Sequence, residues 1–217
     1  MMEPSTIFKR ILTIVSLLSI STGYAQDQPP LNCDLDEVPA YVISFDQVFT
    51  KLISDQPDMK GRRTIIATTD INYLEETGER LDISARLQGE IHYNPYQKEQ
   101  WETLEAIYTY HAQDNIARVR LHASDEKSVT PYKLISESDP NQPIAGYRCN
   151  WSEVDVAGVQ KTQLCRAVFY GWTIPLYTRK IAEGRDVLFS KATDITQRCI
   201  KKDSLYVPED RPWKFSK

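Results

Sequence analysis

The sequence is poor in the residues and patterns on which most recognisable catalytic sites are built. Its 217 residues include only three histidines and eight glycines. They contain no G-x-S-x-G nucleophile turn, no H-E-x-x-H zinc helix and no glycine-rich phosphate loop. An enzyme with an unfamiliar site stays possible, but no motif in the sequence points to a catalytic residue. No cofactor is expected.

The sequence also lacks an excess of positive charge and a second long apolar run. Lysine and arginine number 26 against 30 aspartates and glutamates, a net charge of -4. A mildly acidic chain with dispersed basic residues has no electrostatic basis for holding a phosphate backbone, so nucleic acid is not an expected partner. Beyond residue 25 no apolar stretch approaches the ~20 residues of a spanning helix. We therefore expect a protein that does not span a membrane.

The first 25 residues have the pattern of an export leader. The basic pair Lys9-Arg10 precedes a short apolar run, Ile11 to Ile20, and a small-residue cleavage site that ends at Ala25. The apolar run is about half the length that a spanning helix needs. We expect residues 1–25 to be a signal peptide and the mature protein to be periplasmic or secreted.

Four cysteines follow the leader, at positions where an oxidising compartment would favour disulfides. They are Cys33, Cys149, Cys165 and Cys199. Three connectivities are open to four cysteines, and the sequence does not choose among them. We favour Cys149–Cys165, because these two flank an expected hairpin, and Cys33–Cys199, which would join the ends of the mature chain. The spacing contains no C-x-x-C and no nearby histidine pair, so no metal site is expected.

One amphipathic helix is expected near residues 44–54. Ser44 followed by Gln47 has the form of a capping box. The apolar residues that follow recur at helical spacing: Phe45, Val48, Phe49, Leu52 and Ile53. Residues 55–61, which include Pro57, are expected to end this helix.

After residue 61 the apolar residues alternate with polar ones, which indicates strands with one buried face. The expected strands are 65–73, 81–93, 104–110, 117–123, 132–136, 144–156, 163–170 and 185–193. One face packed against the core and one face exposed to solvent are typical of antiparallel sheets. We expect residues 26–217 to form a single, mainly β domain: a curved antiparallel sheet or half-barrel with one N-terminal amphipathic helix (α+β).

Residues 144–208 carry a series of short motifs. They are Ile144-Ala145-Gly146-Tyr147-Arg148-Cys149, then Cys165, Trp172-Thr173-Ile174-Pro175-Leu176, Ala192-Thr193-Asp194-Ile195 and Ser204-Leu205-Tyr206-Val207-Pro208. This order resembles the "G-Y-K-C … C … I-P-L … A-T-x-I … P" tail of a family of secreted bacterial proteins. Those proteins look like relatives of the periplasmic lipoprotein carriers (LolA/LolB-like). The resemblance covers about a third of the chain and implies a curved half-barrel with a helix against its concave side.

The aromatic content is the remaining signal for function. Four tryptophans and twelve tyrosines would suit an apolar concavity, a protein interface or the core alike. A sheet that curls without closing leaves a concavity that can hold a hydrophobic ligand. We therefore expect a non-enzymatic envelope protein that binds an apolar ligand or lipid-like group in its half-barrel. The expected lining residues are Ile83, Leu87, Val119, Leu121 and Trp172.

Two other functions stay open from the sequence. The first is a protein–protein interaction or assembly factor of the cell envelope, with an envelope protein as partner and a filled core. The second is a hydrolase, which would require His92 and His122, on the polar faces of two expected strands, to converge with a carboxylate.

Overall fold

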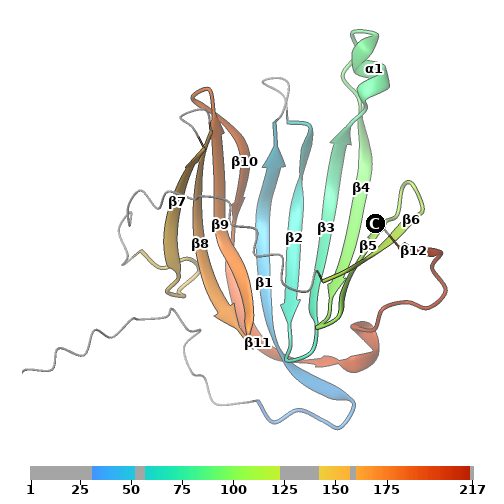
Figure 1. The fold of residues 1–217 in the computed structure, drawn as a ribbon, viewed down its shortest axis with the longest axis vertical. Helices are drawn as coiled ribbons and strands as arrows, with labels where there is room; N and C mark the ends of the chain where they lie inside the picture. The colour runs from blue at the N-terminus through green and yellow to red at the C-terminus, as the bar shows by residue number, and fades with distance from the viewer. Residues whose placement is uncertain (1–30, 52–56, 123–141, 157–159, 216–217) are drawn as a thin grey trace, which may run out of the picture.

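The protein, described by a computed structural model over residues 31–51, 57–122, 142–156 and 160–215, forms one open, curved sheet (Figure 1). The elements follow one another in this order: β1 (Glu37–Thr50), β2 (Met59–Ala67), β3 (Asn72–Leu81), α1 (Ile83–Leu87), β4 (Tyr93–Glu102), β5 (Ala106–His111), β6 (Ile116–Leu121), β7 (Asn150–Val156), β8 (Gln160–Phe169), β9 (Trp172–Ala182), β10 (Arg185–Lys191), β11 (Asp194–Lys201), the 3-10 turn Lys202–Ser204 and β12 (Trp213–Phe215). The expected mainly β fold with a curved sheet is confirmed.

The sheet has twelve strands in the order β12-β6-β5-β4-β3-β2-β1-β10-β9-β8-β7, and β11 pairs with β1. Neighbouring strands run antiparallel, except that β12 lies parallel to β6. No helix in the described part of the chain is long and apolar enough to cross a membrane. The expected leader and the expected strand at 132–136 lie outside the described residues.

The expected helix near 44–54 is wrong, because the chain up to Thr50 belongs to strand β1. β1 pairs with β2 along one edge and with β10 and β11 along the other, so it is a central strand. Hydrogen bonding to strands on both sides outweighs the local helical signal of a short segment. The last part of the expected helix, 52–56, lies outside the described residues.

A β-bulge in β1 explains why its sequence looks helical. The pairing of β1 with β2 shifts by one residue between Phe45 and Val48, which are both buried. Asp46 and Gln47 lie between them and are exposed. The bulge therefore spaces two core residues three positions apart, as a helix would.

The expected strand 81–93 is also wrong, because the chain turns within it. β3 ends at Leu81, the short helix α1 follows, and β4 starts at Tyr93. The carboxylate of Asp82 accepts hydrogen bonds from the backbone N–H groups of Ser84 and Ala85, which caps α1. Gly89 then adopts a φ of 85°, which lets the chain leave the helix. Figure 1 shows α1 at the tip of the connection between β3 and β4.

A second expected strand, 65–73, is divided by a tight turn. β2 ends at Ala67, and the Thr68 N–H donates to the carbonyl of Ile71 before β3 begins. The Thr68 hydroxyl accepts from the Ile71 N–H at 3.0 Å and so reinforces the reversal.

The main core joins two parts of the sheet that are not neighbours in it. It packs Tyr41 and Ile43 of β1 and Ile65 of β2 against β8 and β9. The rings of Tyr41 and Phe169, for example, have centroids 4.9 Å apart. The sheet therefore curves over the face that carries these side chains. We call this the inner face and its reverse the outer face.

The C-terminal segment covers part of the outer face. Trp213 packs edge-on against Trp101 and Tyr108, with ring centroids 6.1 and 5.5 Å apart. Arg211 pairs with Glu99 at 2.7 Å and lies 3.8 Å over the ring of Tyr110. A smaller aromatic cluster thus stabilises the edge formed by β4, β5 and β6.

Both expected disulfides are confirmed. Cys149 bonds Cys165 across the β7–β8 pair, and Cys33 bonds Cys199 where β1 pairs with β11. The Cα–Cα distances are 5.4 Å and 5.5 Å respectively. Two disulfides suggest an oxidising environment of the kind that exported proteins meet.

Candidate functional site

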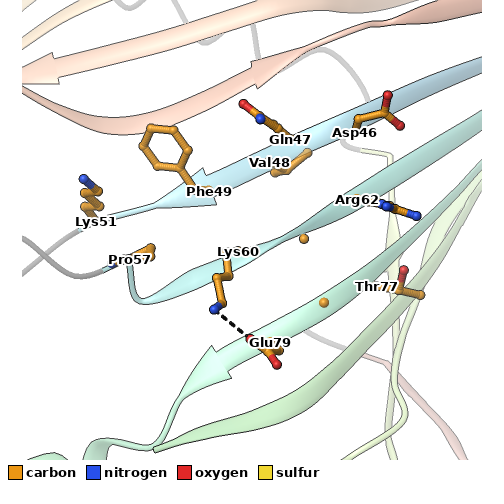
Figure 2. A pocket seen from close by; sticks show the side chains of 12 residues that line it. Asp46, Gln47, Val48, Phe49, Lys51, Pro57, Lys60, Arg62, Thr77 and Glu79 are labelled. Carbon is orange, nitrogen blue, oxygen red and sulfur yellow. Dashed lines mark ion pairs between the residues drawn. The ribbon is translucent and has the colours of Figure 1, made fainter. Parts of the chain in front are cut away.

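A cleft of about 830 Å³ lies at the ends of β1, β2 and β3 (Figure 2). Its wall includes Phe49 and Lys51 at the end of β1, Pro57 before β2, Lys60 and Arg62 of β2, and Glu79 of β3. Lys60 and Arg62 alternate in β2 with residues of the inner face, so they point to the outer face. The cleft is therefore on the outer side of the sheet.

Two glycines that face each other contribute backbone to the floor of the cleft, although their strand positions belong to the inner face. Gly61 of β2 pairs with Gly78 of β3. A Cβ atom at Gly61 would lie 2.2 Å from the carbonyl oxygen of Thr77, and one at Gly78 would lie 2.2 Å from that of Lys60. The backbones approach so closely that no larger residue fits. The glycines therefore allow β2 and β3 to approach closely, and on the outer face the cleft floor is the backbone between outward side chains such as Arg62 and Thr77.

The rim of the cleft is charged and its wall is partly apolar. Lys60 and Glu79 form an ion pair at 2.9 Å with both side chains half exposed, drawn as a dashed line in Figure 2. The hydrogen bond to Glu79 raises the pKa of Lys60. The Lys51 ammonium lies 5.5 Å from the centre of the Phe49 ring. Arg62 adds a third cation and Asp46 a second carboxylate, so the cleft keeps a surplus of positive charge and suits an amphipathic ligand with an acidic group.

A row of titratable side chains crosses the inner face on the other side of the same strands. Register places Arg63 of β2 opposite Glu76 of β3, Glu76 opposite Lys98 of β4, and Lys98 opposite His111 of β5. We call these four residues the inner row. Arg63 Nε donates to the buried Glu76 carboxylate at 2.8 Å, and its Nη1 lies 3.4 Å from the hydroxyl of Ser190.

Burial shifts the pKa values of Lys98 and His111 in the inner row and of the neighbouring Tyr96. It lowers the pKa of Lys98, an effect that Glu76 opposes and Arg63 reinforces. Burial also lowers the pKa of His111, and the charge of Lys98 lowers it further. The pKa of Tyr96 rises to about 12, mainly through burial. The rings of Tyr96 and His111 lie 6.2 Å apart.

The five expected ligand-binding residues do not come together. Ile83 and Leu87 lie in α1 and are 63% and 85% exposed. Val119 is buried in β6 where that strand pairs with β12, and Leu121 is exposed at the end of β6. Trp172 packs against the main core and donates a hydrogen bond to the Thr68 carbonyl at 2.8 Å. None of the five lines the cleft.

The two histidines suggested for a hydrolase lie at opposite ends of β4. His92 directly precedes the strand and contacts Glu90 at 2.9 Å, with both side chains 63% exposed. His122 contacts the carbonyl of Thr103, just after the strand. They therefore do not converge on one carboxylate. Within the described ranges, no three His, Cys, Asp or Glu side chains gather as metal ligands would.

Sequence reasoning missed the cleft because its lining residues come from β1, β2 and β3, whose pairing no local pattern reports. Residues 55–61 were expected to end a helix, whereas Gly61 lies inside β2, and Gly78 lies inside β3. Each glycine stands between charged or polar residues that face outward. A glycine within such a strand indicates a close backbone approach, which could have signalled the β2–β3 pairing beneath the cleft.

No family model matches the chain, and no curated protein matches its sequence. Among solved structures, the chain is similar to an uncharacterised conserved protein from Thermus thermophilus. That likeness has 11% sequence identity and a TM-score of 0.44, and it covers 82% of this chain and 90% of the other. Similarity at this level assigns neither a family nor a function.

Proposed function

We propose that this chain is an exported, non-enzymatic envelope protein that binds an apolar or lipid-like ligand, and that the outer cleft is the binding site. The observation that carries the proposal is the cleft itself. Its volume of about 830 Å³ lies in the range of small-molecule sites. Its floor is the backbone of β2 and β3 between outward-facing side chains.

The cleft lining supports a ligand with an apolar body and an acidic end. Phe49 and Pro57 offer apolar contact, and Lys51 and Arg62 place positive charge on the rim. Lys60 is already paired with Glu79 and contributes less. The inner side of β1 and β2 is filled by core side chains, which favours the outer face as the place of binding.

The leader pattern and the two disulfides support export to a periplasmic or extracellular site. The resemblance of residues 144–208 to relatives of periplasmic lipoprotein carriers agrees with a lipid-like ligand. It remains part of the proposal.

A second candidate is an interaction or assembly factor of the cell envelope. One observation favours it: the tip of the β3–β4 connection exposes Ile83, Leu87 and Ile91 to 63%, 85% and 61%. Exposed apolar residues that cluster at one tip are typical of contact with a partner. Co-purification of a stoichiometric envelope protein that is lost in Leu87→Ser would favour this function.

Titration of the mature protein with an environment-sensitive hydrophobic fluorophore tests the first proposal. Thr77→Trp places a large ring beside the cleft floor from an exposed position. We expect it to weaken fluorophore binding by about tenfold or more, because it occupies the cleft. The control is Thr196→Trp, at an exposed strand position outside the cleft. Equal binding by all three proteins, or none by the parent, would contradict the proposal.

A further inference from the structure

The inner face of β2 to β6 carries more positive than negative charge. Besides Arg63 and Lys98, register places Arg80 of β3 and Arg118 and Arg120 of β6 on this face, against the carboxylates of Glu76 and Glu102. Glu76 and Asp114 are the carboxylates that act on the titration of Lys98 and His111. The surplus faces the concave side of the sheet, where curvature brings the strands' side chains toward one another.

Lys98 lies at the centre of this surplus of positive charge. Glu76 is already engaged, because its Oε2 accepts from both Nε and Nη2 of Arg63. Within the described part of the chain, the half-buried Lys98 ammonium forms no ion pair or hydrogen bond. A half-buried cation whose facing carboxylate, Glu76, is already paired with Arg63 is only partly compensated, and an anionic ligand would reduce that cost.

His111 lies beside Lys98 in the same row and is surrounded mostly by cations. The charged groups that act on it are Lys98, Arg80 and Arg118, which lower its pKa, and Asp114, which raises it. Tyr96 of β4 contacts its ring and adds a hydroxyl group. Three donors of different kinds thus meet on one face: an ammonium, an imidazole and a phenol.

From this geometry we infer that the inner row holds a second binding site, for a phosphate or sulfate group, centred on Lys98 and His111. Tyr96 supplies a neutral donor, and Arg80 and Arg118 attract the anion from the rim. The pairing of Glu76 with Arg63 keeps the carboxylate opposite Lys98 engaged elsewhere. The site lies on the opposite face of the sheet from the outer cleft, so it goes beyond the proposed function.

The phosphate group can come from a free phosphate compound or from a lipid headgroup. A free phosphate and a lipid phosphate present the same oxyanion to Lys98, so the same protein variants test binding of either source. Two probes separate the sources: inorganic phosphate in solution, and phosphatidylcholine vesicles with or without phosphatidylglycerol.

The test is calorimetric titration of the full mature protein with inorganic phosphate. We expect Lys98→Met to weaken binding between about tenfold and a hundredfold, the worth of a hydrogen bond to a charged group. Lys180→Met is the matched control, because Lys180 is also a half-buried strand lysine but lies in β9. It should leave the affinity unchanged. Thermal melts verify that each variant folds, and His111→Gln replaces Lys98→Met should that variant not fold.

The pH dependence gives an independent readout, for which sulfate is the better probe because its charge stays constant. The lowered pKa leaves His111 neutral near neutral pH, and a bound anion favours its charged form. Sulfate affinity should therefore rise as the pH falls from about 8 to about 5.5. His111→Gln should abolish most of that rise.

Each outcome bears on the inference. Lys98-dependent binding of inorganic phosphate supports the site with a soluble ligand. Lys98-dependent binding only to vesicles that contain phosphatidylglycerol supports it with a lipid headgroup. No binding to either probe, or binding that Lys98→Met and His111→Gln leave unchanged, would overturn it. Fluorophore binding at the outer cleft is measured separately, so either site can fail without the other.

Discussion

At the scale of single residues, two ion pairs join β2 to β3, and they differ in how far water reaches them. Arg63 and Glu76 join β2 to β3 on the inner face, with side chains 22% and 7% exposed. Lys60 and Glu79 join them on the outer face, with side chains 51% and 53% exposed. Water screens the outer pair and barely reaches the inner one, so the two should contribute differently to stability.

We predict that Glu76→Gln lowers the free energy of unfolding by about 2–3 kcal/mol, because it leaves the Arg63 guanidinium without its counter-charge. Glu79→Gln, the matched change on the outer face, should alter it by less than about 0.5 kcal/mol. Urea denaturation measures both. Equal effects would show that the inner pair is not isolated from water as described.

The glycine pair gives a second prediction at this scale. Gly61→Ala places a methyl group 2.2 Å from a carbonyl oxygen and should destabilise the protein by about 2 kcal/mol or more. Thr77→Ala, at the exposed neighbour of Gly78, should cost less than about 0.5 kcal/mol. Thermal unfolding distinguishes them. A Gly61→Ala protein as stable as the parent would mean that β2 and β3 are further apart.

At the scale of elements, the sequence predicted both disulfides and some of the strands, but it missed β9, β11 and β12 and misread β1 and the end of β3. The strands around 106–111, 116–121 and 185–191 were expected because their alternation is undisturbed. The bulge at Asp46 and Gln47 imitated a helix, and the cap at Asp82 ended a strand that alternation alone would have continued. Both errors arise from one or two residues that break a regular period.

The disulfides provide the prediction at the element scale. Cys33–Cys199 closes a sequence separation of 166 residues and Cys149–Cys165 one of 16. In the chain-entropy model these contribute about 5 and about 3 kcal/mol. We therefore expect Cys33→Ala/Cys199→Ala to lower stability more than Cys149→Ala/Cys165→Ala. Denaturation of both double variants without reductant tests this order of stability. A larger loss in Cys149→Ala/Cys165→Ala would contradict the expected contributions of the two disulfides.

At the scale of the whole molecule, one sheet presents two chemically distinct candidate sites on its two faces. The mainly β class and the curvature were predictable from alternation and from the resemblance in the last third of the chain. The sites were not, because each depends on pairing between distant residues: Gly61 with Gly78, and Lys98 with Glu76 and His111. No local pattern reports which strands are neighbours.

The claim that the outer cleft holds a lipid-like ligand is tested most directly by native mass spectrometry of the protein isolated from its own compartment. The account predicts an added lipid-like mass on the parent protein and on Thr196→Trp, and its loss from Thr77→Trp. A parent protein that carries no added mass, or an added mass that Thr77→Trp retains, would contradict it.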